Sequence, residues 1–133
     1  AAGRLDLRGR VDSLAGHFAT YNEVDIALDT TPYCGTTTSC EALWMGVPVI
    51  TLAGCRHAAR VGASLLHHAG LPDLVAATAD EFVAIAAGLA TDAPRRAGLR
   101  TTMRDRLAGS PLMDTGAFAA GFADTLAAAW ATP

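Results

Sequence analysis

The chain has 133 residues, a formal net charge of -3 and a hydrophobic content of 51%. A chain of this length and composition forms one globular domain with a modest core. The slightly negative charge and the lack of a long basic run exclude bulk electrostatic attraction to nucleic acid or to an anionic membrane, so neither partner is expected.

Hydrophobic patterning in the first half of the chain predicts strands that alternate with helices. Residues 4–9 alternate apolar and polar side chains, which indicates a first strand. Residues 11–24 fit a helix with Asp12 or Ser13 as its N-cap. Further strands are predicted at residues 26–28 and 47–52, and further helices at residues 39–45 and 56–69. The strand at residues 47–52 is rich in Val, Ile and Leu, which is typical of a parallel strand buried on both faces.

The second half of the chain is predicted to be helical, with helices at residues 80–89, 94–107 and 115–130. The expected fold class is therefore α/β: a partial Rossmann-like parallel sheet of about three strands, flanking helices and a C-terminal helical tail. We expect β/α units in residues 1–76 and a tail in residues 77–133 that packs on the same domain. A complete doubly wound nucleotide-binding domain has about five or six strands, so this sheet resembles the back half of one.

An apolar stripe runs along the last predicted helix. Phe118, Phe122, Leu126 and Trp130 recur every four residues, which places them on one helix face. We expect this face to be buried against the rest of the domain. Any part of the stripe that is exposed would cover another domain or a second copy of the chain.

The connection between the second predicted strand and the second predicted helix carries the most chemical information. Four consecutive hydroxyl residues, 36–39, follow Gly35 and lead into the helix. Free N–H groups at a helix start form a natural phosphate site, and open α/β sheets bind ligands at the carboxyl ends of their strands. Thr37 and Thr38 are therefore predicted to bind phosphate oxygens.

Glu41 lies one helical turn beyond these threonines. A carboxylate can accept two hydrogen bonds at once, which suits the vicinal hydroxyls of a ribose. The segment from Thr38 to Glu41 also fits the S/T-x-x-E capping box, in which Glu41 would accept from the Thr38 N–H group. The residue pattern leaves both interpretations open.

The histidines and arginines outside this connection give weaker signals. His17 could face a ligand from the neighbouring helix, but a lone helical histidine is more often a surface or core residue. Arg56 and Arg60 could meet a diphosphate or could form solvated ion pairs. A metal site is not expected, because the adjacent His67 and His68 point to different sides of a helix and no acidic or thiol ligand completes a set.

The cysteines and the chain ends indicate the setting of the protein. Cys34, Cys40 and Cys55 form no CxxC pair and are odd in number, which favours a reducing compartment. Neither a signal peptide nor an apolar run that could cross a bilayer is visible, so we expect a cytoplasmic protein. Because the chain opens on Ala1 without an initiator Met, we expect it to be a piece of a longer protein.

Three segments resemble the C-terminal donor-binding half of the protein O-GlcNAc transferase family. These glycosyltransferases are typically fused to tetratricopeptide repeats and include SPINDLY-like bacterial members. The resemblance rests on DIALDT at residues 25–30, PYCGTTTSCEALWMGVP at 32–48 and RVGASLL at 60–66, which together cover a large part of residues 17–74. The helical tail matches the family only in outline.

The resemblance implies a GT-B fold with two Rossmann-like domains and a UDP-sugar between them. It places the binding of UDP-GlcNAc at His17, Gly35, Thr36, Thr37, Thr38 and Glu41. Within this set, the two threonines Thr37 and Thr38 would bind the diphosphate, Glu41 the ribose and His17 the uridine. The chain departs from the family where Thr36 replaces Gly or His, Cys34 replaces Asn and Thr20 replaces Arg.

The resemblance also implies an inverting transfer of the sugar to Ser or Thr of an acceptor protein, without a metal or another cofactor. The catalytic acid–base residues and a basic Lys would lie upstream, in an N-terminal GT-B domain next to probable tetratricopeptide repeats, so this chain alone should be inactive. Two alternatives remain open at this point. One is a GT-B transferase that uses another UDP-sugar, and the other is a non-catalytic nucleotide-binding or interaction module, which the departures at Thr20 and Thr36 favour.

Overall fold

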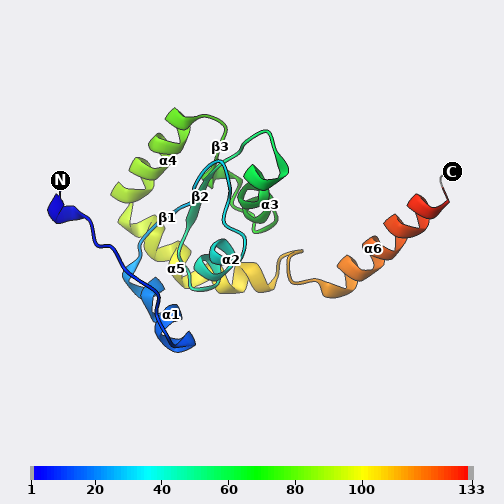
Figure 1. Cartoon of the computed structure of the whole chain (residues 1–133), viewed down its shortest axis with the longest axis horizontal. Helices are drawn as coiled ribbons and strands as arrows, with labels where there is room; N and C mark the ends of the chain where they lie inside the picture. Colours follow the sequence, from blue (N-terminus) through cyan, green and yellow to red (C-terminus); the bar gives the residue numbers. More distant parts are fainter. Residues whose placement is uncertain (1, 132–133) are drawn as a thin grey trace.

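The computed structural model describes residues 2–131 and has an open, parallel, three-stranded sheet at its centre (Figure 1). The strands are β1 (Ala27–Leu28), β2 (Val49–Leu52) and β3 (Val75–Ala76), in the order β1-β2-β3. Ala27 pairs with Val49 in one ladder and Thr51 with Val75 in the other. The α/β class and the partial Rossmann-like sheet predicted from the sequence are confirmed.

Helices cover both faces of this sheet. The α-helices are α1 (Leu14–Thr20), α2 (Thr37–Trp44), α3 (Val61–His68), α4 (Ala79–Thr91), α5 (Ala93–Ala108) and α6 (Thr115–Trp130). Short 3-10 helices are η1 (Ala2–Arg4), η2 (Tyr21–Glu23), η3 (His57–Ala59) and η4 (Pro72–Leu74). α3 and α4 lie on opposite sides of the strands in Figure 1, and α5 packs against α2. The core between them is built mainly from large aliphatic side chains, including Leu43, Ile50, Leu66, Leu74, Leu89 and Met103.

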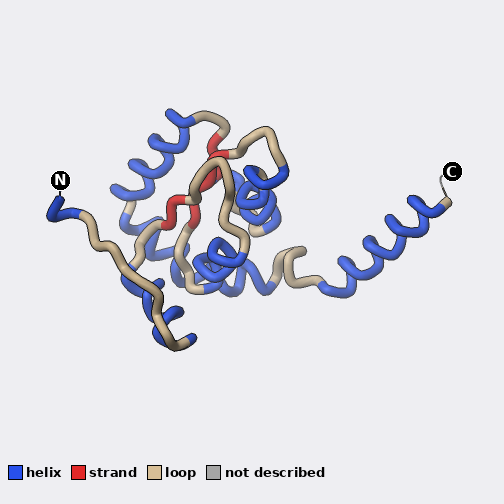
Figure 2. Tube along the Cα trace, viewed as in Figure 1, coloured by secondary structure: helices blue, strands red, loops and turns tan. Residues whose placement is uncertain are grey.

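The predicted strands at residues 26–28 and 47–52 correspond to β1 and β2, but the first predicted strand, at residues 4–9, does not form. Residues 5–11 form an irregular segment after η1 instead of a strand (Figure 2). These residues do alternate apolar and polar side chains, but within residues 2–131 no strand pairs with them. The sheet is completed instead by β3, a two-residue strand that is too short for a hydrophobic period to reveal.

The helix boundaries follow local capping chemistry. Ser13 caps α1 by accepting a hydrogen bond from the Gly16 N–H group, and Thr78 caps α4, which begins one residue before the helix predicted at residues 80–89. The helix predicted at residues 11–24 is divided into α1 and η2, and the one predicted at residues 56–69 into η3 and α3. Gly46 follows α2 at a φ of +79°, a conformation that favours glycine, and it ends that helix.

The last helix differs from its predicted environment. α6 extends away from the body of the molecule (Figure 1), and none of its residues is buried. Phe118, Phe122, Leu126 and Trp130 are 72%, 56%, 56% and 93% exposed, so the interpretation of this stripe as a buried face is wrong for this structure. Within residues 2–131, no helix combines the length and the apolar character needed to cross a membrane.

Candidate functional site

Asp29 fixes the connection between β1 and α2. It follows β1 directly, and its two carboxylate oxygens accept different hydrogen bonds. Oδ1 accepts from the Gly35 N–H group at 2.7 Å, and Oδ2 accepts from the Thr51 hydroxyl at 2.8 Å. Thr51 is a β2 residue with an exposed fraction of 1%. The loop that leads into α2 is therefore fastened to the carboxyl ends of both strands.

The start of α2 offers free donors at this edge of the sheet. Its N-cap is Thr36, whose side chain makes no capping hydrogen bond, and Thr36, Thr37 and Thr38 are all exposed. The first N–H groups of a helix have no partner within the helix, and the helix dipole makes this end attractive to anions. Hydroxyls and free N–H groups therefore lie together where the sequence predicted a phosphate site.

Glu41 forms a cluster with two residues from α1 and η2. Its Oε2 atom lies 2.9 Å from His17 Nε2 and accepts a hydrogen bond from the Tyr21 hydroxyl at 3.0 Å. The capping-box interpretation of Glu41 is therefore wrong, because its carboxylate is bound to another element and not to the Thr38 N–H group. A variant of this motif occurs at the start of α4, where Thr78 accepts from the Glu81 N–H group and Glu81 accepts from the N–H group of Ala77, the residue before the cap.

The contacts within this cluster keep Glu41 ionised. The hydrogen bond from His17 is the main reason that the pKa of Glu41 is lowered, and the Tyr21 hydroxyl acts in the same direction. Burial, followed by the bond to Glu41, raises the pKa of Tyr21 to about 12, so its phenol keeps its proton and remains a donor. The result is a carboxylate acceptor one turn beyond the start of α2.

The predicted site residues fall into two neighbouring groups: the loop and the start of α2, and the pair formed by Glu41 and His17. Gly35 and Thr38 line a cavity of about 230 Å³ at the carboxyl end of β1, together with Tyr21 and Asp29. His17 joins the site through its bond to Glu41 and is 41% exposed at its side chain. The rings of His17 and Tyr21 meet edge to face with centroids 5.6 Å apart.

Sequence reasoning missed three residues that build this site. Tyr21 lies in the helix predicted at residues 11–24, whose pattern does not mark its hydroxyl as a binding group. Asp29 directly follows the strand predicted at residues 26–28, and Thr51 lies within the strand predicted at residues 47–52. A carboxylate directly after one strand and a hydroxyl within the apolar run of the next were the available signals, because parallel strands place them side by side.

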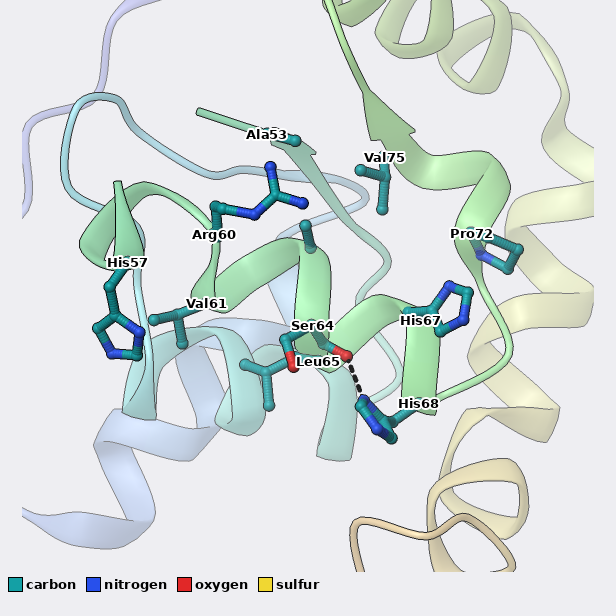
Figure 3. A pocket seen from close by; sticks show the side chains of 11 residues that line it. Ala53, His57, Arg60, Val61, Ser64, Leu65, His67, His68, Pro72 and Val75 are labelled. Carbon is teal, nitrogen blue, oxygen red and sulfur yellow. Dashed lines mark hydrogen bonds between the residues drawn. The ribbon is translucent and has the colours of Figure 1, made fainter. Parts of the chain in front are cut away.

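A larger cavity, of about 720 Å³, lies along α3, and its lining includes Arg60 and the three histidines other than His17 (Figure 3). Arg60 donates to the Gly54 carbonyl at 3.0 Å, and His68 Nδ1 lies 2.8 Å from the Ser64 carbonyl. His57 and His67 are drawn at opposite ends of α3 in Figure 3, so these groups do not converge on one point. No group of three or more His, Cys, Asp or Glu side chains suited to a metal ion occurs in the described part of the chain.

Comparisons with known proteins agree with this architecture. The pattern of glycosyl transferase family 41 matches residues 10–122. The probable UDP-N-acetylglucosamine–peptide N-acetylglucosaminyltransferase SPINDLY of Arabidopsis thaliana is 44% identical over 127 residues, which are 96% of this chain and 14% of that protein. A UDP-N-acetylglucosamine–peptide N-acetylglucosaminyltransferase of Caenorhabditis elegans is 38% identical over 107 residues, or 80% of this chain and 9% of that protein.

The fold of this chain is also similar to that of a solved structure. A mutant of the Thermobaculum terrenum O-GlcNAc transferase superimposes with a TM-score of 0.85 and 46% sequence identity, over 95% of this chain and 24% of that one. The chain thus spans only a small share of the length of its relatives, while the similarity covers nearly all of the chain itself. The family resemblance drawn from the sequence is confirmed, and the chain belongs to glycosyl transferase family 41.

Proposed function

We propose that this chain is the donor-binding part of a protein O-GlcNAc transferase and that it binds the UDP portion of UDP-GlcNAc. The observation that carries the proposal is the exposed hydroxyl-rich start of α2, placed at the strand ends by Asp29 and followed one turn later by the ionised Glu41. The names of the relatives from Arabidopsis and Caenorhabditis support the choice of UDP-GlcNAc as donor and of a peptide as acceptor.

In this proposal the start of α2 binds the diphosphate. Thr37 and Thr38 donate hydroxyl and backbone hydrogen bonds to phosphate oxygens, and the helix dipole stabilises the negative charge on the departing UDP. Glu41 accepts from the ribose hydroxyls, and His17 lies beside the uridine. An acceptor Ser or Thr hydroxyl attacks the anomeric carbon with inversion, and no metal or cofactor takes part. The acid–base residues lie in the rest of the protein, so the chain alone is inactive.

Calorimetric titration of the complete protein that carries this chain tests the proposal. UDP should bind more tightly than UMP, because the second phosphate reaches the start of α2, and more tightly than ADP or GDP, because of the base. If the protein bound GDP or ADP more tightly than UDP, we would conclude that its donor is a sugar nucleotide with that base and not a UDP-sugar. No binding by any of the four would favour the non-catalytic module, in which the loop is only a helix start.

Replacement of both Thr37 and Thr38 by valine should weaken the binding of UDP much more than that of uridine. A lost hydrogen bond to a charged group costs about 1.5–3 kcal/mol, or about 10- to 150-fold in affinity. Thr101 and Thr102 provide a matched control, because they are an exposed pair on α5 whose hydroxyls bond to their own helix. Equal losses for UDP and uridine would contradict the phosphate role.

Glu41→Ala should weaken the binding of UDP by about 1.5–3 kcal/mol, the range for loss of a hydrogen bond to a charged group. The comparison is Glu81→Ala, which removes a glutamate that caps α4 and should change stability but not affinity. An unchanged affinity for UDP in Glu41→Ala would leave Glu41 as a structural partner of α1 and η2 only. Titration calorimetry of both variants measures the difference.

A further inference from the structure

Only one of the two oxygens of the Glu41 carboxylate accepts hydrogen bonds from the described part of the chain. Both hydrogen bonds from His17 and Tyr21 end on Oε2. No other hydrogen bond of this carboxylate occurs within residues 2–131, so Oε1 keeps its acceptor capacity. Two donors on one oxygen also restrict rotation of the carboxylate plane, which a single donor would permit.

The two donors differ in how firmly they are held. Tyr21 is 8% exposed and its ring is part of the hydrophobic core, whereas His17 is 41% exposed at its side chain. Arg100 of α5 also contacts the η2 backbone, donating to the Tyr21 carbonyl at 3.5 Å and to the Val24 carbonyl. The Tyr21 hydroxyl therefore approaches Glu41 from a fixed position, and the His17 ring packs against the tyrosine ring edge to face.

We infer that Tyr21 is a positioning residue of the donor site: it holds Oε2 of Glu41 so that Oε1 is presented to the ribose diol of the nucleotide. This inference rests on the proposed function and adds a residue to it. Tyr21 also lines the cavity at the carboxyl end of β1 that Gly35 and Thr38 line, so it contacts both Glu41 and the site of the loop. Fixing a side chain in its binding orientation before the ligand arrives lowers the entropic cost of binding.

Tyr21→Phe is the direct test, because it removes only the hydroxyl and leaves the buried ring in place. The complete protein and the variant are titrated with UDP and with 2′,3′-dideoxy-UDP, which lacks the diol. The unmodified protein should prefer UDP by about tenfold or more. The variant should bind UDP about 3- to 10-fold more weakly and bind the dideoxy nucleotide unchanged, so its preference for the diol should shrink.

The dideoxy nucleotide separates a positioning role from a structural one. If Tyr21→Phe weakens both nucleotides equally, the hydroxyl supports the fold of the site and the inference is wrong. Unchanged affinity for UDP in the variant would also overturn it. If the unmodified protein binds no UDP, or does not distinguish UDP from the dideoxy form, the proposed role of Glu41 itself fails, and the inference fails with it.

Discussion

Gly62→Ala is expected to destabilise the protein by about 2–4 kcal/mol, the cost of overpacking a buried site and disturbing hydrogen bonds to a carboxylate. Gly62 is a buried residue of α3. A methyl group there would overlap Asp29 Oδ2 and would lie 2.7 Å from Thr51 Oγ1. Thr51 is held inside β2, so Asp29 must move, and its bond to the loop is then strained. Urea unfolding should show a lower midpoint with an unchanged slope.

Gly98→Ala is the matched control for this substitution. Gly98 lies in the interior of α5, and an added methyl group would meet nothing within 4 Å. Alanine is favoured over glycine in a helix by about 1 kcal/mol, so Gly98→Ala should stabilise the protein slightly. The same preference acts at Gly62 but is outweighed there by the collision. If the two variants had equal midpoints, the close approach of α3 to Asp29 would not be a constraint on this fold.

The elements predicted well from the sequence are those whose signals are local. β2 lies in a continuous apolar run, and α2 is bounded by hydroxyl residues at one end and by Gly46 at the other. β3 could not be found in this way, since two residues show no period and the pairing with β2 is decided by tertiary packing. Residues 4–9 show the opposite case. Their side chains alternate apolar and polar as in a strand, but no strand of the described chain pairs with them.

The same distinction applies to the candidate site and to α6. The family resemblance selected His17 and Glu41 separately, but their contact joins two helices and also involves Tyr21, which neither the resemblance nor the hydrophobic pattern indicated as part of the site. In α6, the four-residue spacing identified correctly which residues share one face. A spacing of this kind does not determine what covers the face, and here the rest of the described chain leaves it exposed.

Asp29→Ala is expected to lower the free energy of unfolding by about 2–4 kcal/mol, because two hydrogen bonds to a charged group are lost together. Without the carboxylate, the Gly35 N–H group loses its partner, and the buried Thr51 hydroxyl keeps only a weak contact with Cys34 Sγ at 3.8 Å. The loop before α2 is then no longer fastened to the strands. The affinity for UDP should fall as well, even at temperatures where the variant is folded.

Asp25→Ala separates this effect from a general loss of negative charge. Asp25 is an exposed residue just before β1, and within residues 2–131 it makes no hydrogen bond or ion pair. Its removal should change neither the unfolding midpoint nor the affinity for UDP. If Asp29→Ala behaved like Asp25→Ala, the loop would be held by its own residues and not by the strands.

Asp29→Asn then distinguishes the charge of the side chain from its shape. The amide oxygen can still accept from the Gly35 N–H group, but its NH₂ group faces Thr51, whose hydroxyl must turn and become an acceptor. We therefore expect Asp29→Asn to lie between the wild type and Asp29→Ala in both unfolding and UDP binding. An asparagine as damaging as alanine would show that the ionised carboxylate is required. An asparagine equal to the wild type would show that the geometry of the two acceptors is enough to place the start of α2.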